Sequence, residues 1–465
     1  MKQIELPCKF HNYFRGMKVH FIAIGGSAMH NMAIALHKKG FIVSGSDDEI
    51  FEPSKGRLKK YGLLPNSDGW NPSLISADLD AIILGMHAKK DNPELVKAQE
   101  LGLKIYSYPE YVYEQAKDKK RIVIGGSHGK TSITSMILHV LQSQGIAFDY
   151  LVGAQLEGFE TMVSFSYAPI MVIEGDEYLS SPIDRRPKFL WYKPHIAVLS
   201  GVAWDHINVF PTFENYVDQF HLFAKTIEPN GLLTYFNGDE ELKNIAEKST
   251  SIRLKPYTTP THKIENGITI VGTNYGWLPL KIFGEHNLQN MMAAFNVCLE
   301  LGIEERDFFN SIQSFSGAAK RLEEIARSKQ TVVYKDFAHS PSKLKATSAA
   351  VKKQYADKKV IACMELHTFS SLNKTFLQEY SGCMSETDEA IVYFNPKTIH
   401  HKGLETITKQ DVEEAFLPSK VIVYDDANSV TDYLKSQNLD NSVVLLMTSG
   451  NFDGLNLNDF AQELV

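Results

Sequence analysis

Residues 121–142, RIVIGGSHGKTSITSMILHVLQ, contain an apolar strand, a glycine-rich turn and an amphipathic helix in succession. This order is typical of a phosphate-binding loop, because backbone N–H groups and the positive end of the helix face the phosphate oxygens. Lys130 is then expected to contact the β- and γ-phosphates, and the Thr131 hydroxyl to bind Mg²⁺. An ordinary βα turn remains the alternative, since the spacing is shorter than in the common GxxxxGK[ST] loop.

Short apolar runs alternate with helical patterns on both sides of this loop. The runs are residues 19–24, 41–47, 81–86, 121–126, 170–176, 195–201, 332–338, 359–365, 390–394, 420–425 and 443–450. Such alternation predicts an α/β protein built on parallel sheets. Residues 229–283 are richer in Gly, Thr, Pro and Asn, and we expect hairpins there, followed by a helix from Asn287 to about Leu301. We predict three domains, residues 1–119, 120–318 and 319–465, of which the first and the last are Rossmann-like.

Composition narrows the class of protein. The chain of 465 residues is long enough for roughly three domains, and its 48 Lys+Arg against 55 Asp+Glu argue against a nucleic-acid or anionic-membrane binder. Its four cysteines form no CxxC pair, so a zinc site or a disulfide framework is not expected. No apolar run approaches the ~18 residues of a membrane span, and the N-terminus lacks the pattern of a secretory signal. We therefore expect a cytoplasmic protein.

The loop GSHGKTS, residues 126–132, resembles that of the Mur ligase family, the ATP-dependent amide ligases of peptidoglycan metabolism. Further motifs of the family follow in the same order over nearly the whole chain. The resemblance implies a first domain for a UDP-sugar, a central ATPase domain and a C-terminal domain that closes over the nucleotide, with ATP and Mg²⁺ as cofactors. The implied ATP contacts in the loop are Gly126, Ser127, His128, Gly129, Lys130, Thr131 and Ser132.

Two strand ends are candidate metal sites. Glu174 follows an apolar strand, where open α/β sheets place their ligands, and its carboxylate is suited to Mg²⁺ opposite Thr131. WDHINVF, residues 204–210, follows the next strand and resembles a family motif whose histidine binds a second Mg²⁺, which implies a role for His206. The predicted metal ligands are thus Thr131, Glu174 and His206.

Many family members carry a carbamylated lysine shortly after this motif. Here Lys225 lies slightly too far along the chain, and His221 or a neighbour occupies the position. We therefore predict no carbamylated lysine.

Three later motifs resemble nucleotide contacts of the family. In GEHNLQN, His286 and Asn290 lie one helical turn apart; the resemblance places Asn290 at the adenine and His286 near the nucleotide, while a helix cap is the alternative. GAAKRLE implies that Arg321 reaches an ATP phosphate, which suits a guanidinium. KDFAHSP implies that Asp336 holds the ribose, with His339 beside it. The expected catalytic residues are Lys130, Glu174, His206 and Arg321.

The segment AIGGSAMHNMA, residues 23–33, places a second glycine-rich turn before a helix, and Asp47 follows about twenty positions later. A dinucleotide site is disfavoured, because the third glycine of GxGxxG is missing, but a diphosphate at the helix start fits. The turn resembles that of UDP-N-acetylmuramate ligases. The implied UDP-sugar contacts are Gly25, Gly26, Ser27, Ala28, Met29, Asp47, His87 and Asn92.

The amine substrate is the remaining question. Residues 174–194 resemble the family members that join UDP-N-acetylmuramate, through an acyl phosphate, to the tripeptide L-Ala-γ-D-Glu-meso-diaminopimelate in peptidoglycan recycling. The alternative is the ligase that adds L-alanine in de novo synthesis; a P-loop kinase and a non-catalytic UDP-sugar sensor are more remote. Candidate peptide contacts are Arg185, Arg186, His367 and Ser370, although the arginine pair also fits a solvated turn.

Overall fold

The computed structural model describes residues 16–156, 158–205, 208–265, 267–318 and 321–465. Its N-terminal domain has a parallel four-stranded sheet in the order β2-β1-β3-β4. The strands are β1 (Lys18–Ile22), β2 (Ile42–Ser46), β3 (Ala81–Leu84) and β4 (Ile105–Ser107). The helices are α1 (Ser27–Lys38), α2 (Ser54–Lys60), α3 (Pro93–Glu100), α4 (Tyr108–Ala116) and the 3₁₀ turn η2 (Pro72–Leu74).

The middle domain has a seven-stranded sheet in the order β11-β10-β9-β5-β8-β6-β7, parallel except for β7. Its strands are β5 (Lys120–Gly125), β6 (Asp149–Leu151), β7 (Val163–Ser164), β8 (Ile170–Glu174), β9 (Ile196–Leu199), β10 (Leu232–Phe236) and β11 (Arg253–Tyr257). Its helices are α5 (Lys130–Ser143), α6 (Phe213–Lys225), α7 (Glu240–Glu247), α8 (Glu285–Glu300), α9 (Glu305–Ile312) and η3 (Lys188–Trp191).

The hairpins expected over 229–283 are present in the second part of that stretch only. There β12 (His262–Glu265), β13 (Ile268–Thr273) and β14 (Gly276–Leu280) form a small antiparallel sheet. The first part was predicted wrongly: β10 and β11 pair in parallel, because α7 makes the crossover between them.

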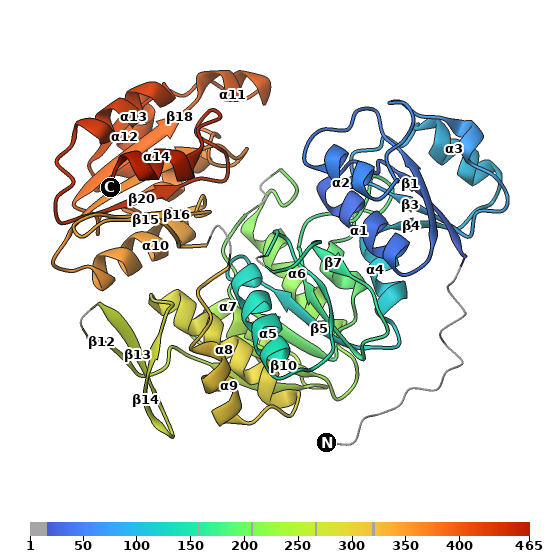
Figure 1. Cartoon of the computed structure of the whole chain (residues 1–465), viewed down its shortest axis with the longest axis horizontal. Coiled ribbons are helices and arrows are strands. Elements are labelled where there is room, and N and C mark those ends of the chain that lie inside the picture. The colour runs from blue at the N-terminus through green and yellow to red at the C-terminus, as the bar shows by residue number, and fades with distance from the viewer. Residues whose placement is uncertain (1–15, 157, 206–207, 266, 319–320) are drawn as a thin grey trace.

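The C-terminal domain has a six-stranded sheet in the order β15-β16-β20-β17-β18-β19, with β15 antiparallel. Figure 1 shows this domain in orange and red. Its strands are β15 (Glu323–Arg327), β16 (Val332–Asp336), β17 (Lys359–Leu366), β18 (Glu389–Phe394), β19 (Val421–Tyr424) and β20 (Ser442–Met447). Its helices are α10 (Pro341–Gln354), α11 (Pro396–His401), α12 (Lys409–Phe416), α13 (Ala427–Ser436), α14 (Leu457–Glu463) and η4 (Phe376–Tyr380).

The central strands are buried on both faces, which is why they read as continuous apolar runs. On β5, Ile122 and Ile124 belong to the core beneath α5 and α8, whereas Val123 belongs to the core on the other face of the sheet. The predicted α/β class with parallel sheets is confirmed. No helix in the described parts of the chain is both long and apolar enough to cross a membrane.

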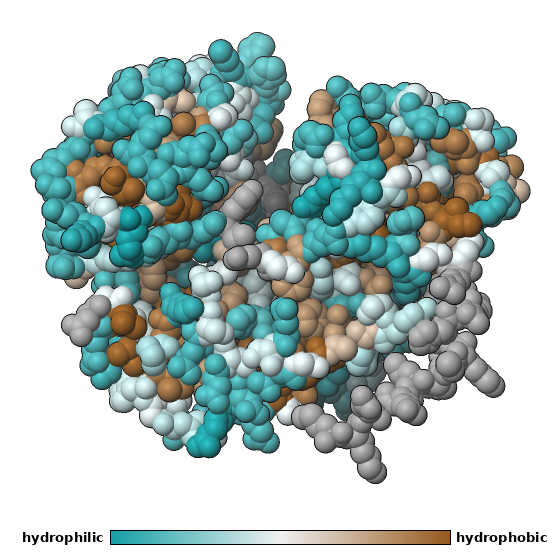
Figure 2. All heavy atoms as spheres, in the orientation of Figure 1, coloured by the Kyte–Doolittle hydropathy of each residue, from teal (hydrophilic) through white to brown (hydrophobic). Residues whose placement is uncertain are grey.

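Both outer domains contact the middle domain. Asn31 on α1 accepts a hydrogen bond from the Met162 backbone N–H at 2.9 Å, which ties the N-terminal domain to the edge of the seven-stranded sheet. On the other side, Gln354 at the end of α10 bonds to Thr269 and to the Gly267 carbonyl. Figure 2 shows the two outer domains as separate lobes above the middle domain; hydrophilic residues cover much of both lobes, whereas this face of the middle domain is mixed.

Candidate active site

The phosphate loop joins β5 to α5 with two glycines in the left-handed region, Gly126 (φ 127°) and Gly129 (φ 77°). A Cβ atom at Gly126 would lie 2.2 Å from Ser200 Oγ, and one at Gly129 would lie 2.3 Å from Asn290 Oδ1. Each of these positions therefore requires glycine for two reasons: the backbone conformation, and the close approach of a neighbouring side chain.

Lys130, the first residue of α5, is held by two acceptors. Its ammonium donates to the Gly126 carbonyl at 2.6 Å and to Glu177 Oε2 at 2.7 Å. Burial alone would lower the pKa of Lys130, but Glu177, with Asp176 and Glu174, reverses this, so the net shift is upward. The lysine is thus a fixed cation at the base of the loop.

Glu177 and Tyr216 were not predicted from the sequence. Glu177 is 1% exposed, and its second oxygen accepts a hydrogen bond from the Tyr216 hydroxyl at 2.9 Å. The Tyr216 hydroxyl also lies 2.8 Å from Ser127 Oγ in the loop. The stretch GDEY gave a signal for Glu177, a second carboxylate just past Glu174, whereas Tyr216 looks like an ordinary core residue of α6.

Glu174 and Thr131 meet where β8 ends. The Thr131 hydroxyl donates to Glu174 Oε1 at 2.8 Å, and the Gly153 backbone N–H donates to Oε2 at 2.8 Å. A hydroxyl and a carboxylate side by side, next to a phosphate loop, are the oxygen ligands that Mg²⁺ prefers together with substrate phosphates. The predicted third ligand, His206, lies outside the described residues.

A cavity of about 320 Å³ lies between the middle and C-terminal domains. Every predicted ATP contact except Gly126 lines it, together with Glu174. The predicted residues that line it are Ser127, His128, Gly129, Lys130, Thr131, Ser132, His286, Asn290, Arg321, Asp336 and His339. Asp205 of the motif WDHINVF also lines it, so tertiary structure brings six separate sequence motifs to one space.

The histidines of this cavity are neutral at physiological pH. Burial lowers the pKa of His128 and of His286 to about 4, and that of His339 to about 3. Among the described residues, the cations that line the cavity are therefore Lys130, Arg321 and Lys343.

Asp336 ends β16 and is buried against the cavity. Its carboxylate accepts hydrogen bonds from the backbone N–H groups of Leu322 and Ala338. Burial raises its pKa, while the nearby Arg321 guanidinium opposes the rise. Arg321 itself lies over the Phe337 ring, 4.7 Å from the ring centre.

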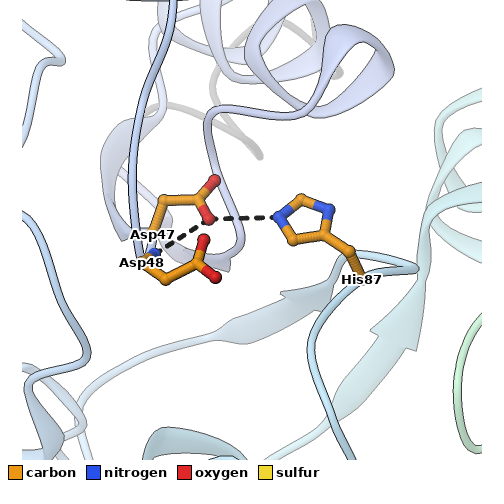
Figure 3. A group of neighbouring side chains, drawn as sticks. All are labelled: Asp47, Asp48 and His87. Atoms are coloured by element: carbon orange, nitrogen blue, oxygen red, sulfur yellow. Dashed lines mark hydrogen bonds and ion pairs between the residues drawn. The ribbon is translucent and has the colours of Figure 1, made fainter. Parts of the chain in front are cut away.

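In the N-terminal domain, three polar side chains, Asp47, Asp48 and His87, lie together close to the glycine-rich turn at Gly25 (Figure 3). Asp47, almost fully buried, accepts hydrogen bonds from the Gly25 N–H at 2.6 Å and from the Asp48 N–H at 3.0 Å, and it pairs with His87 Nε2 at 3.1 Å. This pairing raises the pKa of His87. Asp47, Asp48 and His87 each offer a ligand atom within 4.8 Å of the others.

The turn itself is placed as the sequence predicts. Gly25 and Gly26 precede the first residue of α1, Ser27; Ser27 and Ala28 are exposed, and Met29 is buried. Backbone N–H groups at an open helix start are available to an anion.

Asn92, by contrast, has a structural role. Its side-chain oxygen caps α3 by accepting from the N–H groups of Glu94 and Leu95, and the residue is buried. Helix capping explains this asparagine without a ligand.

None of the four candidate peptide contacts is among the residues that line the cavity. Arg186 pairs with Asp184 at 2.9 Å and stacks on Trp191, while Arg185 is exposed. His367 lies 3.4 Å from the buried Glu365 at the end of β17, and Ser370 is buried just beyond. Lys225 and His221 lie on α6 and do not line the cavity.

Known protein families match this chain over most of its length. Family models match at residues 18–120 (Mur ligase family, catalytic domain), 124–298 (Mur ligase middle domain) and 320–450 (Mur ligase, glutamate ligase domain). A UDP-N-acetylmuramate–L-alanine ligase of Caldicellulosiruptor saccharolyticus is 33% identical over 390 residues, 81% of this chain and 83% of the relative.

Two solved structures share the fold. A murein peptide ligase from Psychrobacter arcticus superposes with a TM-score of 0.66 at 21% identity, covering 96% of this chain and 99% of its own. A UDP-N-acetylmuramate–alanine ligase from Thermotoga maritima gives 0.68 at 20% identity, covering 94% and 96%. Given the three domain matches and the identity to the curated relatives, this chain belongs to the Mur ligase family, whose members are ATP-dependent amide ligases.

Proposed function

We propose that this protein uses ATP to join the lactate carboxylate of UDP-N-acetylmuramate to the amino group of L-alanine. One observation carries the proposal: the phosphate-loop lysine, the Thr131–Glu174 pair and Asp336 with Arg321 line a single cavity between two domains. The carboxylate would attack the γ-phosphate of ATP to give an acyl phosphate and ADP. The amine would then attack the acyl carbon, and inorganic phosphate would leave.

The residues contribute position and charge rather than a nucleophile. Lys130 would neutralise the phosphoryl oxygens, Asp336 would hold the ribose and Arg321 would contact a phosphate. Thr131 and Glu174 would hold Mg²⁺, which supplies further charge neutralisation when bound. Because an acyl phosphate is hydrolysed by water, a site enclosed between two domains fits this chemistry.

The UDP-sugar would bind across the N-terminal domain. The open start of α1 at Gly26 and Ser27 would accept the diphosphate, and the buried Asp47 beside His87 would face the uridine. The contact between α1 and Met162, the residue before β7, ties this domain to the middle domain, so that the bound sugar can extend toward the ATP site.

L-Alanine is the favoured amine because curated relatives with this specificity are 33% identical over four fifths of the chain. The tripeptide is the second candidate, favoured by one observation. The segment between β8 and β9 carries RRPKFLWY with Arg185 exposed, and an arginine there is available to the carboxylates of a peptide. The fold does not separate the two, since the two TM-scores are nearly equal.

The test measures ADP release with ATP, Mg²⁺ and UDP-N-acetylmuramate, with L-alanine, the tripeptide or no amine added. We expect turnover with L-alanine and an amide product. Turnover with the tripeptide alone would replace the favoured amine by the second candidate. A stable phosphorylated product without amine would indicate a kinase, and no ADP release under any condition would contradict the ligase proposal.

A further inference from the structure

Lys343 reaches from the C-terminal domain into the cavity that contains the phosphate loop. It lies in the first turn of α10, and its side chain is 20% exposed. Its ammonium lies 3.9 Å from the carboxylate of Asp205, which belongs to the middle domain. This lysine belongs to none of the motifs described above, since it lies two residues beyond KDFAHSP.

The two lysines of the cavity are held differently. Lys130 lies 2.7 Å from Glu177, a hydrogen-bonded ion pair, whereas 3.9 Å between Lys343 and Asp205 is too long for a hydrogen bond. Among the described residues, the Lys343 ammonium makes no polar contact other than this long ion pair. Its protons are therefore available to an anion in the cavity.

The charges around Lys343 also indicate an anion. Burial lowers the pKa of Lys343 to about 8; Lys130 and Arg321 add to the shift, and Asp205 and Glu177 oppose it. Carboxylates line the cavity too, but Glu177 is hydrogen-bonded to Lys130, whereas Lys343 has only the longer contact with Asp205 among the described residues. A bound anion would therefore reduce the repulsion that Lys343 receives from Lys130 and Arg321. A chain of phosphates supplies several negative charges to such a cavity.

Building on the proposed function, we propose that Lys343 is a further nucleotide-binding residue, whose ammonium contacts the phosphate chain of ATP from the C-terminal domain. Asp205 is its positioning residue on the middle domain. Since Lys130 and Lys343 belong to different domains, a phosphate chain held by both would bridge the middle and C-terminal domains.

The test compares Lys343→Met with Lys343→Arg and with Lys345→Met, an exposed lysine on the same helix. ATP with Mg²⁺, and separately adenosine, are titrated into each protein by calorimetry. We expect Lys343→Met to weaken ATP binding about tenfold or more, since hydrogen bonds to charged groups contribute that much, and to leave adenosine binding unchanged. Lys343→Arg should restore most of the affinity, and Lys345→Met should match the wild type.

Two results would overturn the assignment. Either ATP binding by Lys343→Met equals that of the wild type, or ATP and adenosine weaken equally, which would indicate a structural role. If the wild type binds no ATP, the proposed function fails together with this inference. If the wild type releases ADP with its substrates and Lys343→Met does so with the same KM for ATP, only the inference fails.

Discussion

The ammonium of Lys130 and the carboxylate of Glu177 form a buried ion pair of 2.7 Å beneath the phosphate loop. Replacing Glu177 by Gln removes the counter-charge but keeps the shape. We expect the free energy of unfolding to fall by about 2–3 kcal/mol, because Lys130 keeps its charge in a site from which water is largely excluded.

The control is Glu240→Gln, which breaks the exposed pair with Lys243 on α7 and should cost less than ~0.5 kcal/mol. Denaturant unfolding measures both. Equal decreases in the free energy of unfolding would show that the buried Lys130–Glu177 pair stabilises the fold no more than an exposed pair does.

Lys130→Ala is expected to abolish most substrate-dependent ADP release. Loss of one group that stabilises developing charge typically lowers the turnover number on the order of 10²–10³-fold. Lys248→Ala, an exposed lysine after α7, serves as the control. Unchanged turnover in Lys130→Ala would remove this lysine from the chemistry.

Glu174→Gln tests the metal assignment. The substitution keeps the size of the side chain but weakens an oxygen ligand. We therefore expect the Mg²⁺ concentration for half-maximal activity to rise by at least about tenfold. Glu247→Gln, exposed on α7, should leave the Mg²⁺ requirement unchanged. A normal Mg²⁺ titration of Glu174→Gln would exclude this carboxylate as a ligand.

Gly129 and Gly145 lie at opposite ends of α5, both with positive φ, and form a matched pair. Gly145→Ala meets no atom within 4 Å and should cost about 1–2 kcal/mol of backbone strain. Gly129→Ala adds a clash with Asn290, which brings about 1–3 kcal/mol more and displaces the loop. Unfolding and ATP-binding measurements should therefore separate the two, and identical behaviour would contradict the close packing of Asn290 on the loop.

His87 should titrate above its ordinary range, because its hydrogen bond to Asp47 raises the pKa of the imidazole. The folded state then binds the proton more tightly than the unfolded state. The pair therefore stabilises the fold below about pH 6.5, and this contribution disappears as the pH rises through the folded-state pKa. Since the His87 side chain is about half exposed, the effect is small, under ~1 kcal/mol.

NMR titration of the His87 ring measures this shift. Asp47→Asn should lower the pKa, and the exposed Asp118→Asn should not change it. A His87 pKa that is the same in Asp47→Asn and in the wild type would show that this contact does not cause the shift.

Much of the architecture could be predicted from local pattern. Parallel strands buried on both faces appear in the sequence as apolar runs, which predicted the α/β class. A glycine-rich turn before a helix indicated each of the two loops. The positions of Lys130, Thr131 and Glu174 therefore followed from neighbouring residues alone. The parallel pairing of β10 and β11 did not follow, because a short crossover helix in a Gly- and Asn-rich segment resembles a series of turns.

The sequence by itself determined the fold class, the phosphate loop and the order of the motifs, since each depends on residues within one or two elements. Tertiary structure alone decided that Glu177 and Tyr216 support the loop and that Lys343 faces Asp205 across two domains. The physical reason is that ion pairs and close contacts depend on distances in space. Residues 130 and 343 lie more than two hundred positions apart, and only the packing of the C-terminal domain on the middle domain brings their charges to one cavity.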